Sequence, residues 1–142
     1  MRDRIARRGR IETSLFGMLL GGAFPLALGA MLSDWGYYRT YQIQWINFAD
    51  WLVAGSLLFG GLALAWAVIG NFVRGRWSHR LSMVTAIALL LFFIVQFFNA
   101  LTHSKDAFAT MPAGLSLSVI ATLIALIATW TGFASLDDGD AR

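Results

Sequence analysis

The sequence of 142 residues contains no cysteine, only two prolines and only two histidines. Without cysteine it can form no disulfide, no thiolate metal site and no covalently attached c-type haem. Charged residues make up 13% of the chain, about half of the roughly 25% that is usual in soluble domains. Hydrophobic residues make up 58%. This composition excludes a water-soluble globular enzyme and a disordered tail, and at this length it predicts a single domain.

The formal net charge of +3 does not indicate nucleic-acid binding. The basic residues sit in two short clusters beside apolar segments instead of covering a polar face, which is a membrane pattern. Nothing resembles a nucleotide-binding glycine loop, a metalloprotease helix or a hydrolase elbow. We therefore expect the lipid bilayer as the surrounding partner, no nucleic acid and no enzymatic activity.

Four apolar segments are long enough to cross the ~30 Å hydrocarbon core of a bilayer as helices. They cover residues 15–32, 51–73, 81–101 and 115–133. None has an ionisable residue in its middle, and the short links between them favour antiparallel neighbours. The sequence predicts an all-α, integral membrane four-helix bundle of up-and-down topology, in which residues 1–142 form one transmembrane domain.

The basic residues predict the orientation of this bundle. Nine of the eleven Lys and Arg residues precede the first span, join the second to the third, or follow the fourth, and only Arg39 and Lys105 belong to the other side. The positive-inside rule then predicts cytoplasmic termini and two outward loops. The first span also has the pattern of a cleaved signal, but its length and its glycine pairs favour a retained helix.

Small residues on the spans predict close packing of the helices. Examples are Gly17-x-x-x-Gly21 in the first span and Gly61-x-x-x-Ala65 in the second. In lipid, such residues allow two backbones to approach closely. We expect these faces to pack within the chain, and a homo-oligomer is the alternative.

One face of the third span carries residues at steps of three and four, and its outer half is polar. They are Ser82, Thr85, Leu89, Phe92, Gln96, Asn99 and His103. Gln96 and Asn99 should point into the bundle, toward hydroxyls of the fourth span such as Ser118 and Thr122, because an amide facing lipid is costly. Since no Asp, Glu, Lys or Arg accompanies the stripe, its simpler role is to fix the packing. The alternative is a site for a proton or a quinone head group at Gln96, Asn99 and His103.

Titratable residues should gather beyond the outer ends of the spans, in an outer polar cluster. They are Asp34, Arg39, Asp50, His103, Lys105 and Asp106. A histidine near a carboxylate is suited to exchanging protons or contacting a polar ligand. The simpler interpretation is that Asp50 and Asp106 pair with the two basic residues and tie the outer loops together.

The first outer loop, residues 35–48, is rich in aromatic residues. Tyr41, Trp45 and Phe48 would share one face if the loop were helical, so we expect it to lie flat on the membrane. Docking of a periplasmic protein on these rings is the alternative.

The two histidines, His79 and His103, flank the third span. They are 24 positions apart, which corresponds to about 36 Å of helix. They cannot ligate one iron, so a bis-histidine haem within the chain is excluded. We expect no metal and no resident cofactor apart from the quinone of the alternative above.

Several short motifs resemble those of one protein family. They are D-W-L-V-A-G at residues 50–55, N-A-L-T-H-S-K-D-A at 99–107, M-P-x-G-L-x-L-S at 111–118 and T-G at 131–132. This pattern is similar to that of a bacterial four-span membrane family catalogued as a domain of unknown function, and the likeness runs from the first span to Gly132. The motif positions in this sequence are Asp50, Asn99, His103, Asp106, Pro112 and Gly114.

The resemblance implies a multi-pass protein of the bacterial inner membrane, often encoded beside periplasmic quinoprotein sugar dehydrogenases or other redox proteins. We therefore expect first a non-enzymatic anchor or accessory subunit for a periplasmic or membrane redox partner. The alternative is a quinone-binding or proton-conducting redox protein that uses the outer polar part of the third span. A solute transporter is disfavoured because no buried charge or pair of broken helices marks a substrate site.

Overall fold

The computed structural model describes residues 2–74 and 79–140, and within them it is almost entirely helical. The four long helices are α1 (Arg2–Thr40), α2 (Ile43–Arg74), α3 (Arg80–His103) and α5 (Ala113–Asp140), and the short α4 (Ala107–Thr110) connects α3 to α5. Each long helix contains an apolar stretch long enough to cross a membrane. The predicted all-α four-helix bundle is confirmed, and its helices extend beyond the predicted spans at both ends.

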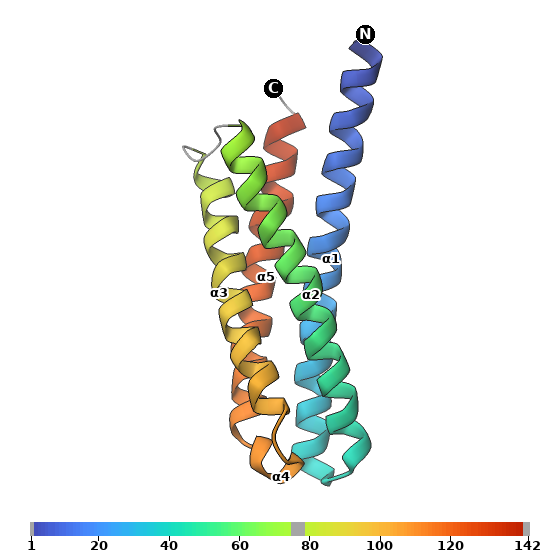
Figure 1. Ribbon diagram of the computed structural model, residues 1–142, viewed down its shortest axis with the longest axis vertical. Coiled ribbons are helices and arrows are strands. Elements are labelled where there is room, and N and C mark those ends of the chain that lie inside the picture. Colours follow the sequence, from blue (N-terminus) through green and yellow to red (C-terminus); the bar gives the residue numbers. More distant parts are fainter. Residues whose placement is uncertain (1, 75–78, 141–142) are drawn as a thin grey trace.

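The long helices run up and down around the bundle in chain order (Figure 1). α1 contacts α2 and α5, and α3 contacts the same two helices from the other side. The beginning of α1 and the end of α5 lie at one end, and α4 lies at the other, called the α4 end below. Basic residues up to Arg10, with Arg74 and Arg80, belong to the end of the two termini. Arg39 and Lys105 belong to the α4 end, as predicted, and Arg76 and Arg142 lie outside the described residues.

Buried residues recur at alternating steps of three and four along all four long helices. On α1 they are Phe16, Leu20, Ala23, Ala27, Ala30, Asp34 and Tyr37; on α2, Ile46, Ala49, Val53, Ser56, Gly60 and Ala63; on α5, Gly114, Ser118, Ala121, Ala125, Ala128, Gly132 and Ser135. On α3 all seven residues of the predicted stripe are buried. This seven-residue spacing is typical of helices packed as left-handed coiled coils, and we call each inward row a seam.

Glycines in the seams make room for bulky neighbours. A Cβ added at Gly60 would overlap the ring of Phe92, and a Cβ at Gly132 would overlap Leu20. Both neighbours are 0% exposed, so neither can move aside without disturbing the centre of the bundle. By contrast, a Cβ at Gly21 would meet nothing within 4 Å. The predicted packing of small residues within the chain is confirmed only in part: Gly17 and Gly61 lie against Phe133 and Phe93, but Gly21 and Ala65, the other members of the two predicted motifs, are exposed.

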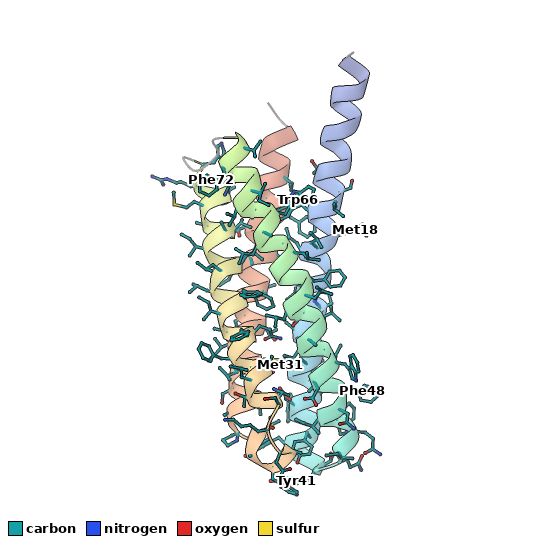
Figure 2. All side chains as sticks on the ribbon, in the orientation of Figure 1. Met18, Met31, Tyr41, Phe48, Trp66 and Phe72 are labelled. Atoms are coloured by element: carbon teal, nitrogen blue, oxygen red, sulfur yellow. The ribbon has the colours of Figure 1, made fainter. Side chains whose placement is uncertain are left out.

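The first outer loop is not the flat interfacial segment predicted for residues 35–48. α1 continues to Thr40 and α2 begins at Ile43, so only two residues link them. Tyr41 ends α1 with a φ of 55°, in the left-handed conformation that commonly closes a helix. Phe48 projects outward from α2 (Figure 2). The prediction was wrong because the outward face of a continuous helix has the same aromatic spacing as a helix lying on the membrane.

Candidate functional site

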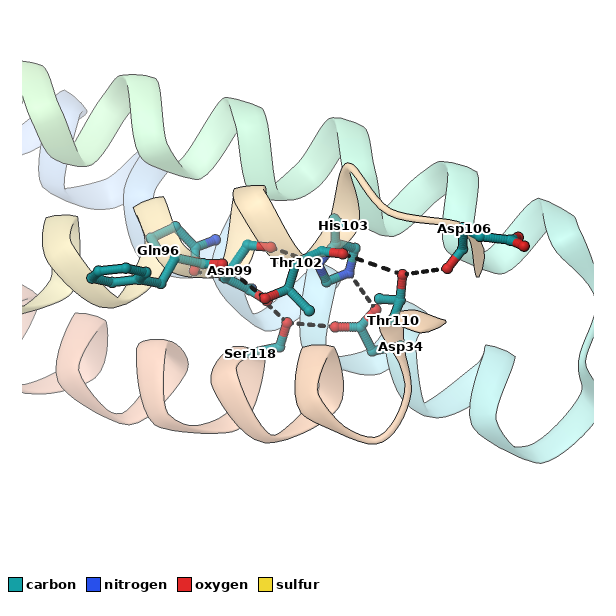
Figure 3. Close-up of polar contacts among 9 residues, drawn as sticks. Asp34, Gln96, Asn99, Thr102, His103, Asp106, Thr110 and Ser118 are labelled. Carbon is teal, nitrogen blue, oxygen red and sulfur yellow. Dashed lines mark hydrogen bonds and ion pairs between the residues drawn. The ribbon is translucent and has the colours of Figure 1, made fainter. Parts of the chain in front are cut away.

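Polar residues of all four seams meet in the half of the bundle near the α4 end, and Figure 3 shows those of α1, α3 and α5. Each of them is at most 7% exposed. We call this set the buried polar network: Asp34 on α1, Ser56 on α2, Gln96, Asn99 and His103 on α3, and Ser118 on α5. Because the seams face one another, four helices each contribute at least one side chain to the same region.

His103 and Asp34 form an ion pair at the α4 end of this network. Nε2 of His103 lies 2.8 Å from Oδ1 of Asp34, and the two side chains are 3% and 0% exposed. Ser118 donates a short hydrogen bond from Oγ to Oδ2 of Asp34. On its other side, Nδ1 of His103 lies 3.0 Å from the backbone oxygen of Asn99. The imidazole is thus held between one helix turn of α3 and a carboxylate from α1.

The pair holds one shared proton inside the bundle. The Asn99 carbonyl oxygen can only accept, so Nδ1 of His103 carries a hydrogen and donates to it. A second hydrogen must then lie between Nε2 and Oδ1 of Asp34, since two lone pairs 2.8 Å apart would repel. Whether that proton resides on the imidazole or on the carboxyl group, the pair is neutral as a whole. Its burial therefore costs less than that of a lone carboxylate.

Two amides carry the network farther along α3. Asn99 donates from Nδ2 to Oγ of Ser118 at 2.9 Å and to Oε1 of Gln96 at 3.4 Å. Gln96 donates from Nε2 to Oγ of Ser56. The predicted inward orientation of both amides is confirmed, and so is the contact of Asn99 with α5. Gln96 instead reaches α2, a contact that the sequence did not predict.

The second hydroxyl predicted to receive these amides has other partners. Thr122 donates from Oγ1 to the backbone oxygen of Ser118 at 2.7 Å and to that of Ala27 at 3.1 Å. The latter contact joins α5 to α1. Thr122 therefore contributes to helix packing beside the network and makes no contact with the amides.

Two buried oxygens next to the network lack a hydrogen-bond partner. Among the described residues, these are Oδ1 of Asp50 and Oδ1 of Asn99. Asp50 lies on α2, is half-buried, and is close enough to His103 and Asp34 to interact electrostatically with both. Both unpaired atoms are acceptors, so what the site lacks is a hydrogen-bond donor.

The predicted outer polar cluster divides into two groups. Asp34, Asp50 and His103 come together inside the bundle, while Arg39, Lys105 and Asp106 are exposed. The predicted ties between these carboxylates and the two basic residues are wrong: in the described part of the chain, the ion pair at this end joins His103 to Asp34. The physical reason is that Asp50 faces the neighbouring helices, whereas Arg39 lies on the outer surface of α1.

Gly114 allows α5 to approach the imidazole. A Cβ at this position would lie 3.0 Å from Cε1 of His103 and 2.7 Å from Cγ2 of Thr110. Thr110 is itself 0% exposed, and it belongs to α4. In the sequence, Gly114 was only a position in the motif of the family that the chain resembles. In the structure, Gly114 packs against the imidazole ring of His103.

The polar network stops well before the end that carries the termini. Beyond Gln96, the α3 seam continues with Phe92 and Leu89, which are 0% and 1% exposed and pack in apolar clusters. Farther from the network, Oγ1 of Thr129 donates to the backbone oxygen of Leu20 at 3.4 Å, and the Oγ1 atoms of Thr85 and Thr131 lie 3.0 Å apart. An apolar layer therefore separates the network from the far end of the bundle.

The sequence pattern predicted Asp34 to lie just after the first span and did not indicate Ser56. The signal that identifies both is the seam itself. Steps of four and three lead along α1 from Ala27 and Ala30 to Asp34, and the seam of α2 leads from Val53 to Ser56. Extending the spacing used for the third span to the other helices would have predicted both residues to be buried.

His79 precedes α3 and His103 ends it, so the two histidines lie at opposite ends of that helix, as their spacing predicts. Comparisons of the chain with protein-family models, with curated proteins and with solved structures found no match. The resemblance to a bacterial four-span family therefore stays a prediction.

Proposed function

We propose that this chain is a multi-pass protein of the bacterial inner membrane that binds the head group of a quinone at the α4 end, beside the Asp34–His103 pair. The observation that carries the proposal is an ionisable pair buried between four apolar helices. Ionisable side chains among membrane helices are costly, and they commonly mark sites for ligands or protons. The packing interpretation of the third span depended on the absence of such a group, and Asp34 removes that premise.

Two further features support a quinone over other ligands. The buried acceptors of Asp50 and Asn99 are unpaired at the same end of the bundle, where the hydroxyl groups of a reduced quinone could donate to them. A quinone also has an apolar ring and tail, which suit the lipid-facing surface around these helices. Conduction of protons across the whole membrane is not supported, because the apolar layer at Phe92 and Leu89 interrupts the network.

Quinone content of the purified protein tests this proposal. The wild-type chain and the variants His103→Gln and Asp34→Asn are purified in mild detergent, and bound quinone is extracted and quantified by mass spectrometry. We expect quinone in the wild type and a loss of about 10-fold or more in each variant, because each change breaks the Asp34–His103 pair and shifts the groups that surround the head group.

His79→Gln is the matched control, because it makes the same change at the opposite end of α3. It should retain the wild-type quinone content. A wild-type protein that carries no quinone and binds none when quinone is added would overturn the proposal, and so would equal losses in all three variants. Circular dichroism confirms that each variant is folded.

The second candidate function is an anchor or accessory subunit for a periplasmic or membrane redox partner. It is favoured by exposed aromatic residues at the tip of the α4 end (Figure 2). Tyr41 stacks on Phe108 with ring centroids 6.4 Å apart, and the two residues are 62% and 73% exposed. Aromatic side chains are enriched among the residues that dominate protein interfaces.

Copurification from native membranes tests this second function. The untagged chain should bring down a stoichiometric redox protein, and the double variant Tyr41→Ala, Phe108→Ala should recover about 10-fold less of it while keeping its quinone. Recovery of the chain alone, or an unchanged complex with the double variant, would contradict the anchor function at this surface.

A further inference from the structure

The orientation of each amide in the buried polar network follows from one backbone carbonyl. Ser56 donates from Oγ to the backbone oxygen of Val53 at 2.9 Å, so its Oγ can only accept from Gln96. Nε2 of Gln96 must face Ser56, and its Oε1 then faces Nδ2 of Asn99. As a result, the amide oxygen of Asn99 is the atom left without a partner.

The hydrogens at the other end of the network are also fully used. Nδ1 of His103 donates to the Asn99 carbonyl, and the shared proton lies between Nε2 and Asp34. The hydroxyl hydrogen of Ser118 goes to the second oxygen of Asp34. His103 and Ser118 therefore have no hydrogen left to donate to a ligand.

The unpaired atoms of the site are a carboxylate oxygen of Asp50 and the amide oxygen of Asn99, which is 0% exposed. A ligand that pairs with them must bring hydrogens of its own. The oxygens of a quinone only accept hydrogen bonds, whereas each oxygen of a hydroquinone carries a hydrogen that can be donated. We propose that this site selects the reduced, hydroquinone form of the head group over the oxidised quinone. The inference rests on the proposed quinone site and names the redox form that it holds.

Asp50 is the residue that should set this preference. Asp34 already pairs with His103, so Asp50 is the carboxyl group beside the network whose buried Oδ1 has no hydrogen-bond partner. A hydroxyl that donates to a carboxylate forms a charge-assisted bond, about twice as strong as a neutral one. A quinone carbonyl at the same place would be repelled by the carboxylate.

Equilibrium binding to the full-length chain in lipid nanodiscs tests the inference. The probes are a decyl-substituted benzohydroquinone, kept reduced with dithionite, and the same compound in its oxidised quinone form. We expect the wild type to bind the hydroquinone about 10-fold or more tightly than the quinone. In Asp50→Leu the affinity for the hydroquinone should fall by about 10-fold, and that for the quinone should not fall, because the repulsion of its carbonyl is removed.

Asp106→Leu is the matched control, because it removes an exposed carboxylate at the same end of the bundle. It should leave both affinities unchanged. If Asp50→Leu fails to fold, Asp50→Asn keeps the size of the side chain but loses the charge and gains an amide donor, so it should lower the hydroquinone affinity several-fold and leave the quinone affinity equal or higher.

Each remaining outcome overturns a different statement. Equal affinities in the wild type, or tighter binding of the quinone, overturn the preference for the hydroquinone and leave quinone binding at this site intact. Equal losses for both forms in the Asp50 variant overturn the role of Asp50. Binding of neither form overturns the proposed function as well, and assigns the two unpaired oxygens to water.

Discussion

Asp34 and His103 stabilise each other in a bundle whose other inward residues are mainly apolar or small. Each is costly to bury alone, because removal of one partner leaves an uncompensated polar group among apolar helices. Together they form a neutral unit with a single shared proton. The contribution of this pair to the stability of the bundle therefore depends on the interaction between the two side chains.

A double-mutant cycle on the pair measures this coupling. His103→Leu and Asp34→Leu should each lower the free energy of unfolding by about 3–5 kcal/mol, because each leaves a buried partner unpaired. The double variant should be less destabilised than the sum of the two, since both polar groups are gone. The measurement is denaturant-induced unfolding in detergent micelles, followed by circular dichroism. Additive effects would show that the two side chains do not interact.

Gly114→Ala tests the contact between α5 and the imidazole. The added methyl group would press on Cε1 of His103 at 3.0 Å and on Thr110 at 2.7 Å, so the ring or the α4 turn must shift. We expect bound quinone to fall by about 10-fold, as for other displacements of about 1 Å or less at a binding site. Gly70→Ala should keep the wild-type quinone content, because a Cβ there meets nothing within 4 Å. Equal quinone contents in both variants would contradict a positioning role for Gly114.

Among the helices, the seams decide which side chains meet. The sequence predicted the seam of α3 in full but not those of α1, α2 and α5. On α3 the polar residues distinguish the inward face from the lipid-facing one. On the other helices most inward positions are alanine or glycine, and in lipid these differ little in hydropathy from the outward face. The inward positions of these helices are identified by their spacing of three and four residues and not by their hydrophobicity.

Gly60→Ala tests packing at the seam of α2. Its added Cβ would overlap the buried ring of Phe92, so we expect a loss of about 1–3 kcal/mol in the free energy of unfolding. Gly21→Ala is the matched control, because a methyl group there has open space and alanine is the better helix former. Thermal unfolding in detergent distinguishes them, and a Gly60 variant as stable as the Gly21 variant would contradict the close contact.

For the whole bundle, most of the described basic residues lie at the end opposite to the buried polar network. The predicted orientation therefore puts the network on the outer side of the membrane. The apolar layer beyond Gln96 separates it from the cytoplasmic side. This arrangement suits exchange of ligand or protons with the outer side only.

The absence of native cysteine makes this orientation easy to test. Lys105→Cys places a thiol at the α4 end and Arg80→Cys places one at the end that carries the termini; both replace an exposed basic residue. In intact spheroplasts, a membrane-impermeant maleimide should label the first variant and spare the second until the membrane is opened. The reverse labelling pattern would invert the orientation and place the polar network on the cytoplasmic side.

The number of spans and the separation of basic residues between the two ends were determined by the sequence alone. A membrane helix must satisfy its own backbone hydrogen bonds and fill about 30 Å of lipid, so its existence depends on a local run of residues. The partners of the buried polar groups were decided by the tertiary structure. Asp34 meets His103 across 69 positions of sequence, and Gln96 meets Ser56 across 40. Such pairs depend on how each helix is rotated and how far it is shifted along its neighbours, and no local pattern contains that information.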